Sequence, residues 1–292
     1  MIADASCNVV YYSDLLPGRC PVAYRAMADI LDRYGVPHTA LTGTKDIWVR
    51  DFMPIQAFHD RYLRYSYTPD YLRDDEHYRH TMSDPVTVCR ENGVTVDGSL
   101  ESIRLDGGNV VRSSTKFIMT AKVFEENPAI PVRELCRMLE EGFGAEMVVL
   151  PWDAKEIYGH ADGIVRIVDA DTAIMGNYRQ IDPRMGQRFL NMLKARFRTV
   201  HELHFDVERL SRYSWAYINW LQTDRVIVVP SFGVPEDEQA QRQIEQWMPE
   251  YRGRIELAAA CDLVRGGGAF NCATWTVYEA FANRRLDDGT CR

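Results

Sequence analysis

The sequence lacks the features that would place the chain outside the class of ordinary globular proteins. It has no run of eighteen apolar residues, and its N-terminus has neither a basic start nor an apolar core, so neither a membrane helix nor a signal peptide is predicted. No proline-rich linker or low-complexity segment divides the chain. With 46% apolar and 26% charged residues, we expect a single cytoplasmic domain over residues 1–292.

Paired cysteines and dense basic clusters are missing as well. The seven cysteines form no CxxC pair, and their odd number argues against a disulfide framework, so at least one thiol is expected to be free. The net charge is −8 without a block of Lys and Arg, which argues against a nucleic-acid-binding surface. HExxH and EF-hand spacings are absent, and we expect neither a metal nor a cofactor.

The sequence does contain a unit that recurs about every fifty residues. Segments 50–67, 106–120, 159–176 and 218–233 each begin at a polar or glycine-bearing turn, continue as a short apolar strand and return as a second strand rich in Val, Ile or Met. Each segment predicts a β-hairpin. A fifth unit begins at GGGAFNCATWTVYEAF, near the C-terminus, but its second strand is not evident.

Helical stretches alternate with these hairpins. The stretch at 21–35 begins with Pro, ends with Gly and places apolar residues at helical spacing. Three further helices are expected at 131–144, 183–197 and 236–250. Because one helix and one hairpin cannot bury their apolar faces alone, the period predicts a radial array of five α/β units around a common axis.

A polar residue marks the entrance of each unit. These five landmarks are Asp51, Asp106, His160, Asn219 and Cys272, which are 55, 54, 59 and 53 residues apart. Asp162 follows two residues after His160. Because residues i and i+2 of a strand point to the same side, this pair is expected to flank one substrate atom.

If these side chains converge, Cys272 is the only strong nucleophile among them. It would react as the thiolate and would need a cationic neighbour or a base, a role open to His160. Two carboxylates beside a thiol raise its pKa and repel an oxyanion, which argues against acyl transfer. A guanidinium substrate resolves this conflict. Each carboxylate can accept paired N–H bonds from the planar guanidinium, and the positive charge of the guanidinium would stabilise the thiolate.

Five motifs together resemble the agmatine deiminase and bacterial peptidylarginine deiminase family, within the guanidine-modifying (pentein) superfamily. They are DIWVRDFMPI (46–55), RLDGGNVV (104–111), GHADGIVRIVD (159–169), YINWLQTDRVIVVPSFG (217–233) with DEQA (237–240), and GGGAFNCATW (266–275). The resemblance implies a five-bladed α/β propeller. It also implies a cofactor-free hydrolase acting on C–N bonds, which would convert agmatine or a similar small guanidine to a ureido product and ammonia, as in polyamine biosynthesis.

The resemblance implies a role for each matching residue. Cys272 would attack the guanidinium carbon, forming a thiouronium intermediate. His160 would protonate the departing ammonia and then activate water. Asp51 and Asp162 would bind the guanidinium nitrogens.

Some positions depart from the usual pattern of the family. Asp106 stands where Glu usually precedes two glycines and orients the catalytic histidine, and it is one methylene shorter. Asn271 stands where agmatine deiminases usually have His, and Trp275 where a proline-ended segment is expected. Trp48 would form a wall of the substrate channel. The departures concern the rim of the pocket more than the reacting atoms.

Several alternatives stay open. The same fold could serve an arginine or peptidylarginine deiminase, an amidinotransferase, or a guanidine-binding propeller without turnover, and a general cysteine hydrolase is a further possibility. A substrate carboxylate could be bound by Arg50, Arg104, Arg166, Arg179 or Arg265. The charged segment 71–80 is expected to be a solvated loop, with a lid over the cleft as the alternative. Helical faces on the blades could pair two subunits as a homodimer.

Overall fold

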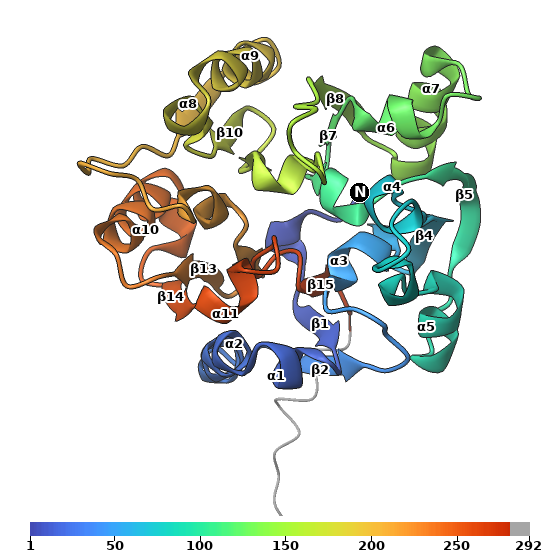
Figure 1. Cartoon of the computed structure of the whole chain (residues 1–292), viewed down its shortest axis with the longest axis horizontal. Coiled ribbons are helices and arrows are strands. Elements are labelled where there is room, and N and C mark those ends of the chain that lie inside the picture. Colours follow the sequence, from blue (N-terminus) through green and yellow to red (C-terminus); the bar gives the residue numbers. More distant parts are fainter. Residues whose placement is uncertain (281–292) are drawn as a thin grey trace, which may run out of the picture.

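The structure, a computed structural model, describes residues 1–280 and arranges five small β-sheets in a ring (Figure 1). Every sheet has three strands, and its middle strand runs antiparallel to one neighbour and parallel to the other. A helix on the outer rim connects the two parallel strands of each sheet. This architecture is the five-bladed α/β propeller expected from the sequence.

The hairpin strands of four blades match the predicted hairpins. The five sheets are β15, β1 and β2 (Thr274–Val277, Val9–Ser13, His38–Leu41); β3, β4 and β5 (Ile55–Phe58, Arg61–Ser66, Asp97–Arg104); β6, β7 and β8 (Val111–Arg112, Lys116–Thr120, Glu146–Leu150); β9, β10 and β11 (Val165–Ile167, Thr172–Met175, Thr199–Glu202); and β12, β13 and β14 (Leu221–Gln222, Ile227–Ser231, Ile255–Ala259). The third, parallel strand of each blade was not predicted.

Four of the five outer helices agree with the predicted ones. The outer helices are α2 (Pro21–Arg33), α5 (Pro85–Glu91), α7 (Val132–Phe143), α9 (Pro183–Lys194) and α10 (Pro235–Trp247). The helix α5 was missed because it is short, although Asp84 caps it by accepting hydrogen bonds from the backbone N–H groups of Val86 and Thr87.

Shorter helical segments connect the blades. They are α1 (Leu16–Arg19), α3 (Val49–Phe52), α4 (Asp70–Arg73), α6 (Lys122–Glu126), α8 (Tyr178–Ile181) and α11 (Cys261–Val264), with the 3-10 turns η1 (Asp4–Ser6), η2 (Arg79–Thr81), η3 (Gly107–Asn109), η4 (Ala161–Gly163), η5 (Ser214–Ile218) and η6 (Pro249–Tyr251). Among residues 1–280, no helix is long and apolar enough to cross a membrane.

The outer helices form because each buries one apolar face against its sheet. In α7, Leu135 and Leu139 are fully buried at helical spacing, and the ring of Phe143 packs edge-on against Phe117 of β7 with centroids 4.9 Å apart. The helix ends at Gly144, whose φ of 63° is left-handed. Apolar cores therefore lie between each sheet and its outer helix, which leaves the ring's inner ends free to carry polar groups.

The fifth blade is completed by the opposite end of the chain. Strand β15 pairs antiparallel with β1, which in turn pairs in parallel with β2. Asn8 extends the closure, because its side chain exchanges two hydrogen bonds with the backbone of Glu279 at 3.0 and 2.8 Å. The second strand missing from the fifth unit is thus the N-terminal strand. Cys291 and the end of the predicted 1–292 domain lie outside the described residues, and that single domain remains a prediction.

Candidate active site

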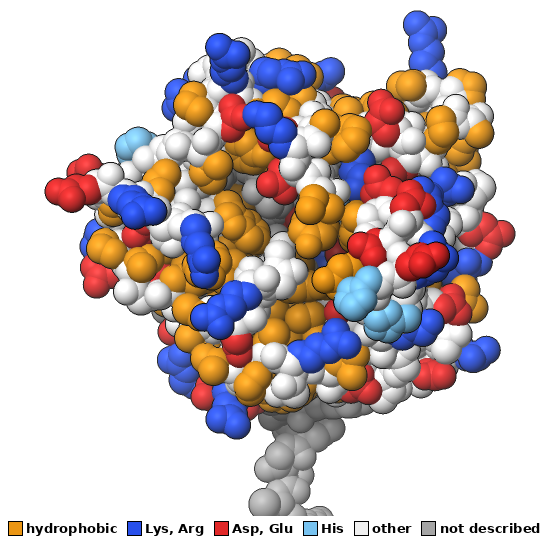
Figure 2. Space-filling model, in the orientation of Figure 1, with side chains coloured by type: hydrophobic (Ala, Val, Ile, Leu, Met, Phe, Trp, Pro, Cys, Tyr) orange, Lys and Arg blue, Asp and Glu red, His pale blue; other side chains and the backbone are white. Residues whose placement is uncertain are grey.

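The five landmark residues converge where the first strands of the blades begin. Asp51 is on α3, Asp106 and His160 precede η3 and η4, Asn219 follows η5, and Cys272 lies two residues before β15. A cleft of about 890 Å³ opens here. Figure 2 shows hydrophobic side chains around a hollow near the centre of this face.

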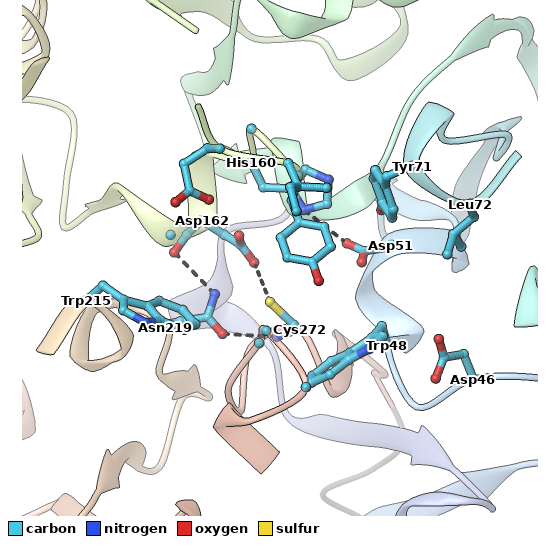
Figure 3. Close-up of a pocket in the computed structure, with 18 of the residues that line it drawn as sticks. Asp46, Trp48, Asp51, Tyr71, Leu72, His160, Asp162, Trp215, Asn219 and Cys272 are labelled. Carbon is cyan, nitrogen blue, oxygen red and sulfur yellow. Dashed lines mark hydrogen bonds and ion pairs between the residues drawn. The ribbon is translucent and has the colours of Figure 1, made fainter. Parts of the chain in front are cut away.

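The residues predicted from the sequence are brought together in this cleft. Five of them line it directly: Trp48, Asp51, His160, Asp162 and Cys272 (Figure 3). The sixth, Asp106, lies behind His160 and is almost fully buried. The sequence therefore identified the constellation, and the roles of its members in a reaction are taken up below.

His160 lies between two carboxylates. Its Nε2 is 2.9 Å from Oδ2 of Asp106, and its Nδ1 is 3.6 Å from Oδ1 of Asp51. Asp106 thus reaches the imidazole although it is one methylene shorter than Glu. Burial lowers the pKa of His160, but Asp51, Asp106 and Asp162 more than offset this and raise the pKa to about 9. The imidazole is accordingly protonated at neutral pH.

The Cys272 thiol faces a carboxylate rather than the imidazole. Its Sγ donates a hydrogen bond to Oδ2 of Asp162 at 3.4 Å. Burial raises the pKa of the thiol well above its ordinary value, and Asp162 and Asp51 raise it further. This confirms the expectation that carboxylates would oppose the thiolate. Without a bound substrate cation to offset Asp162 and Asp51, Cys272 is therefore a neutral thiol, although the imidazolium of His160 lies in the same cleft.

Two buried amides organise Asp162 and the nucleophile. Asn271 donates to Oδ2 of Asp162 at 2.7 Å. Asn219 accepts hydrogen bonds from the backbone N–H groups of Ala269 and Cys272, at 3.1 and 3.3 Å, and donates to the carbonyl of Asp162. The sequence marked both positions but gave neither a function, because amide side chains carry no reaction-specific signal.

Asp51 is held by the backbone of the neighbouring blade. The N–H of Gly108 donates to its Oδ1 at 3.1 Å. Burial raises the pKa of Asp51 to about 7, since Asp106 and Asp162 add to that effect while His160 opposes it. A Cβ on Gly108 would lie 2.6 Å from both Oδ1 of Asp51 and Nδ1 of His160, so only glycine allows the two side chains to approach.

The glycine-rich loop before Cys272 allows a second close approach. A Cβ on Gly268 would lie 2.5 Å from the ring of Trp48 and 2.9 Å from the Cβ of Cys272. The indole of Trp48 therefore rests directly on the loop that carries the nucleophile (Figure 3). Trp48 forms a wall of the cleft, as expected.

The local conformation of His160 and Asp162 differs from the expectation. They are not alternate residues of a strand, because residues 161–163 form the 3-10 turn η4 and β9 begins only at Val165. His160 itself is extended, with φ −83° and ψ 141°. Both side chains nevertheless line the same cleft. The turn η4 bends the chain at the end of the blade that faces the ring axis.

The charged segment 71–80 contributes to the cleft wall. Residues 74–80 are exposed, as expected of a solvated loop. Tyr71 and Leu72, however, line the cleft (Figure 3). The hydroxyl of Tyr71 donates to Oδ2 of Asp106 at 3.2 Å. Asp75 and Tyr78, which are exposed, line the cleft as well, so the solvated residues of the segment also border the site.

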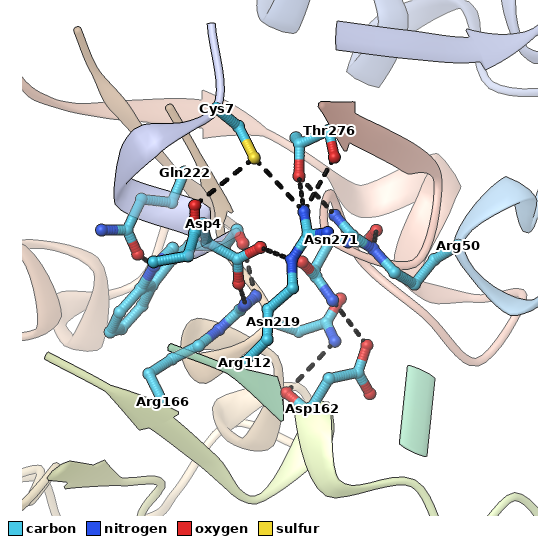
Figure 4. Close-up of polar contacts among 12 residues, drawn as sticks. Asp4, Cys7, Arg50, Arg112, Asp162, Arg166, Asn219, Gln222, Asn271 and Thr276 are labelled. Atoms are coloured by element: carbon cyan, nitrogen blue, oxygen red, sulfur yellow. Dashed lines mark hydrogen bonds and ion pairs between the residues drawn. The ribbon is translucent and has the colours of Figure 1, made fainter. Parts of the chain in front are cut away.

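A cluster of buried arginines lies behind the cleft (Figure 4). Asp4 pairs with Nε of Arg112 at 2.8 Å and with Nη1 of Arg166 at 3.2 Å. Arg50 is also buried and donates to the carbonyl of Asn271 at 3.2 Å. These guanidinium groups are structural. Arg50 and Arg166 also interact electrostatically with Asp162.

The other three candidate arginines are exposed. Arg179 pairs with Glu202 on the outside of its blade, and Arg104 faces solvent at the end of β5. Arg265 lines the mouth of the cleft. Of the five arginines considered for a substrate carboxylate, Arg265 is therefore the one that the structure places at the cleft.

The donor set suits an organic cation better than a metal ion. Within residues 1–280, no group of three or more His, Cys, Asp and Glu side chains is arranged as a metal site. Six of the seven cysteines fall in this range, and all six are free thiols. Carboxylates on two sides of the cleft can instead accept the in-plane N–H groups of a guanidinium.

Comparisons with known proteins agree with this architecture. A family model described as Porphyromonas-type peptidyl-arginine deiminase matches residues 22–277. An agmatine deiminase of Stutzerimonas stutzeri (strain A1501) is 24% identical, and the match covers 78% of this chain and 73% of that protein. Solved agmatine deiminases of C. jejuni and Enterococcus faecalis both have a TM-score of 0.73, at 14% and 16% identity, and each match covers 96% of this chain and 95% of the other. At these identities, the structural likeness shows a shared fold.

Proposed function

The chain belongs to the Porphyromonas-type peptidyl-arginine deiminase family, and from this premise we propose that it hydrolyses a small guanidine, agmatine or a close relative, to a ureido product and ammonia. The observation that carries the proposal is the meeting of Cys272, His160, Asp51 and Asp162 in one cleft. Burial, together with Asp162 and Asp51, raises the pKa of Cys272 in the free enzyme, so a cationic substrate between the two carboxylates would favour the thiolate.

Substrate binding would activate the nucleophile. A guanidinium between Asp51 and Asp162 replaces the thiol as the partner of Asp162 and offsets both negative charges. The positive charge then lowers the pKa of Cys272 and favours loss of the thiol proton. Because the sulfur lies beside Asp162, a substrate bound to that carboxylate brings its central carbon close to the sulfur.

The reaction would then proceed in two halves. The Cys272 sulfur forms a bond to the guanidinium carbon, and protonated His160 gives its proton to the departing nitrogen, which leaves as ammonia. A cationic thiouronium remains on sulfur. Neutral His160 next removes a proton from water, whose oxygen attacks the same carbon. Cleavage of the C–S bond leaves its electron pair on sulfur as the thiolate, and the protonated ureido group that departs gives its extra proton to solvent water.

The charges around the mouth favour a substrate with a cationic tail. Beyond the reacting residues, the cleft is lined by Asp46, Asp75, Asp153 and Glu156. Two of the cations there are already paired, Arg19 with Asp46 at 2.9 Å and Lys155 with Asp182 at 3.1 Å. An amine-bearing guanidine such as agmatine fits this balance of charge.

Arg265 supports a second candidate substrate. It is exposed at the mouth and forms no ion pair with any of residues 1–280. A guanidinium in that position can bind a carboxylate with two hydrogen bonds. Free arginine or a peptide ending in arginine would present such a carboxylate, so these compounds belong in the substrate panel.

Ammonia release tests the function directly. We expect the parent enzyme to release ammonia from agmatine at pH 8, and Cys272→Ala to lower kcat by at least about 10³-fold, because the covalent step needs the sulfur. Cys136→Ala is the matched control, since Cys136 is a free, half-buried thiol on the outer helix α7 and should leave activity unchanged.

The outcomes separate the alternatives. Full activity of the Cys272→Ala variant would contradict the mechanism. Transfer of the amidino group to an added amine would indicate an amidinotransferase, and tight guanidine binding without ammonia would indicate a binding protein. The cytoplasmic location, the place in polyamine biosynthesis and the homodimer expected from the sequence remain predictions.

A further inference from the structure

The carboxylate of Asp106 has a second partner besides His160. Its Oδ2 accepts from Nε2 of His160 at 2.9 Å and from the hydroxyl of Tyr71 at 3.2 Å. The torsion that turns an aspartate carboxylate is soft, so one contact leaves the plane of the group poorly defined. Two donors on the same oxygen restrict that rotation and fix the direction in which the carboxylate meets the imidazole.

Tyr71 is itself held by a buried cation. The Nζ of Lys122 lies 4.8 Å from the centre of the Tyr71 ring and 3.0 Å from Oδ1 of Asp70, the preceding residue. The same ammonium donates to the carbonyls of Ile157 and Tyr158 at 3.3 and 2.9 Å. A buried ammonium must keep such partners because losing them is costly. Lys122 therefore joins α4 to the segment that leads into His160.

Aromatic contacts continue this connection. The rings of Tyr71 and Tyr158 pack edge to face with centroids 5.0 Å apart, and each lies about 6 Å from the imidazole of His160, at 6.2 and 6.1 Å. Tyr71 thus has a packed ring and a hydroxyl that donates to Asp106. Such an arrangement suits a residue that fixes the orientation of Asp106, and through it that of His160, rather than one that takes part in the reaction.

We propose that Tyr71 is a positioning residue for the deiminase: its hydroxyl holds the Asp106 carboxylate against the imidazole of His160, and Lys122 keeps Tyr71 in place. Tyr71 is in α4, directly before the exposed residues 74–80. The contact with Asp106 therefore also holds the start of these residues close to His160. The kinetic part of the test rests on the proposed function, because it measures ammonia release. The titration of His160 needs no substrate and is independent of that function.

Several charged groups act on His160, and the test must account for them. The carboxyl groups are Asp51, Asp106, Asp162, Glu126 and Glu156, and the nearby cation is Lys122. Only Asp106 forms both a hydrogen bond with the imidazole and a contact with Tyr71. Removing the Tyr71 hydroxyl therefore changes the environment of His160 through Asp106 alone.

The test is an NMR titration of the His160 imidazole in Tyr71→Phe, with the resonance assigned by its loss in His160→Gln. If Asp106 turns away without the hydroxyl, the pKa of His160 falls by about one unit. We also expect kcat to fall about 10- to 100-fold, more than KM changes, because the proton donor is displaced.

Tyr34→Phe is the matched control. It removes the same kind of bond, a tyrosine hydroxyl donating to Glu256 at 2.8 Å, but on the outer surface beyond α2. The pKa of His160 should not change in this variant. An unchanged or raised pKa in Tyr71→Phe would overturn the proposal, because Asp106 would then be held without the hydroxyl. An equal fall in Tyr34→Phe would overturn it as well. If the parent releases no ammonia, the proposed function fails while the titration still decides the role of Tyr71.

Discussion

His160 and Asp51 face each other at 3.6 Å, and each changes the protonation of the other. Burial raises the pKa of Asp51 to about 7. Burial lowers the pKa of His160, but the surrounding carboxylates raise it to about 9. Two groups that interact this strongly titrate as a pair. At the scale of single residues, the free site therefore combines an ionised Asp51 and a protonated His160 only between about pH 7 and about pH 9.

This pair predicts a bell-shaped dependence of kcat/KM on pH. Below about pH 7 Asp51 becomes protonated and binds the guanidinium poorly, and above about pH 9 His160 loses the proton that the leaving nitrogen needs. Initial rates of ammonia release from about pH 5.5 to about pH 10.5 would show the maximum between these limits. In Asp106→Asn the upper limit should move to lower pH, because a carboxylate that supports the imidazolium is lost. A profile that stays flat across both limits would contradict the assignment.

At the scale of elements, the loop between α11 and β15 places the nucleophile by contact with a neighbouring blade. Asn219, which immediately precedes the blade of β12, β13 and β14, accepts the N–H groups of Ala269 and Cys272. Trp48 rests on the glycines from the other side. The loop is thus held by residues from two other parts of the ring in addition to its own internal hydrogen bonds.

Gly268→Ala tests this placement. The added Cβ would lie 2.5 Å from the Trp48 ring and 2.9 Å from the Cβ of Cys272, so the loop or the indole must shift. A displacement of about 1 Å can lower a rate by about 10²-fold, and we expect a loss of this size in kcat/KM for ammonia release. Gly18→Ala is the control, because nothing lies within 4 Å of the position that its new methyl group would occupy in α1, and activity should be kept. Parent-like kcat/KM in Gly268→Ala would show that the contact does not constrain the nucleophile.

At the scale of the whole molecule, the N-terminal segment closes the ring twice. Strand β1 completes the fifth blade, and Asp4 lies between Arg112 and Arg166 from two other blades. Asp4 is largely buried, and although burial raises its pKa, Arg112, Arg50 and Arg166 bring that pKa below its usual value. A single carboxylate therefore forms ion pairs with guanidinium groups of two different blades.

Asp4→Asn should destabilise the fold. The variant leaves buried guanidinium charges without their counter-ion, and the free energy of unfolding at pH 7 should fall by about 3–5 kcal/mol in urea titrations. Because the folded pKa of Asp4 is below the unfolded value of about 3.9, this contribution is present above about pH 4 and is lost as the pH falls further.

The control for that prediction is Asp29→Asn, on the exposed face of α2. Asp29 takes part in no ion pair among residues 1–280, so the change should stay within about 0.5 kcal/mol. Equal stability of Asp4→Asn and Asp29→Asn at pH 7 would show that the buried pairs do not hold the ring together.

The sequence by itself determined the repeat, the hairpins, most outer helices and the set of residues that meet in the cleft. These features are written in local patterns, such as alternating apolar residues, the glycines beside Asp106 and the polar landmark at each entrance. The spacing of about fifty residues was enough to predict that Cys272 and His160 meet, because every unit presents the same end to the axis.

Only the tertiary structure decided which residues support that set. The partner of β15 is the strand β1 at the other end of the chain, with Val9 opposite Val277. Tyr71 donates to Asp106, and Lys122 joins Asp70 to the carbonyl of Tyr158, although these residues are distant in sequence. Asn219 gains its role only where the blades meet. Such contacts depend on how the ring closes, and no local pattern of apolar and polar residues encodes that closure.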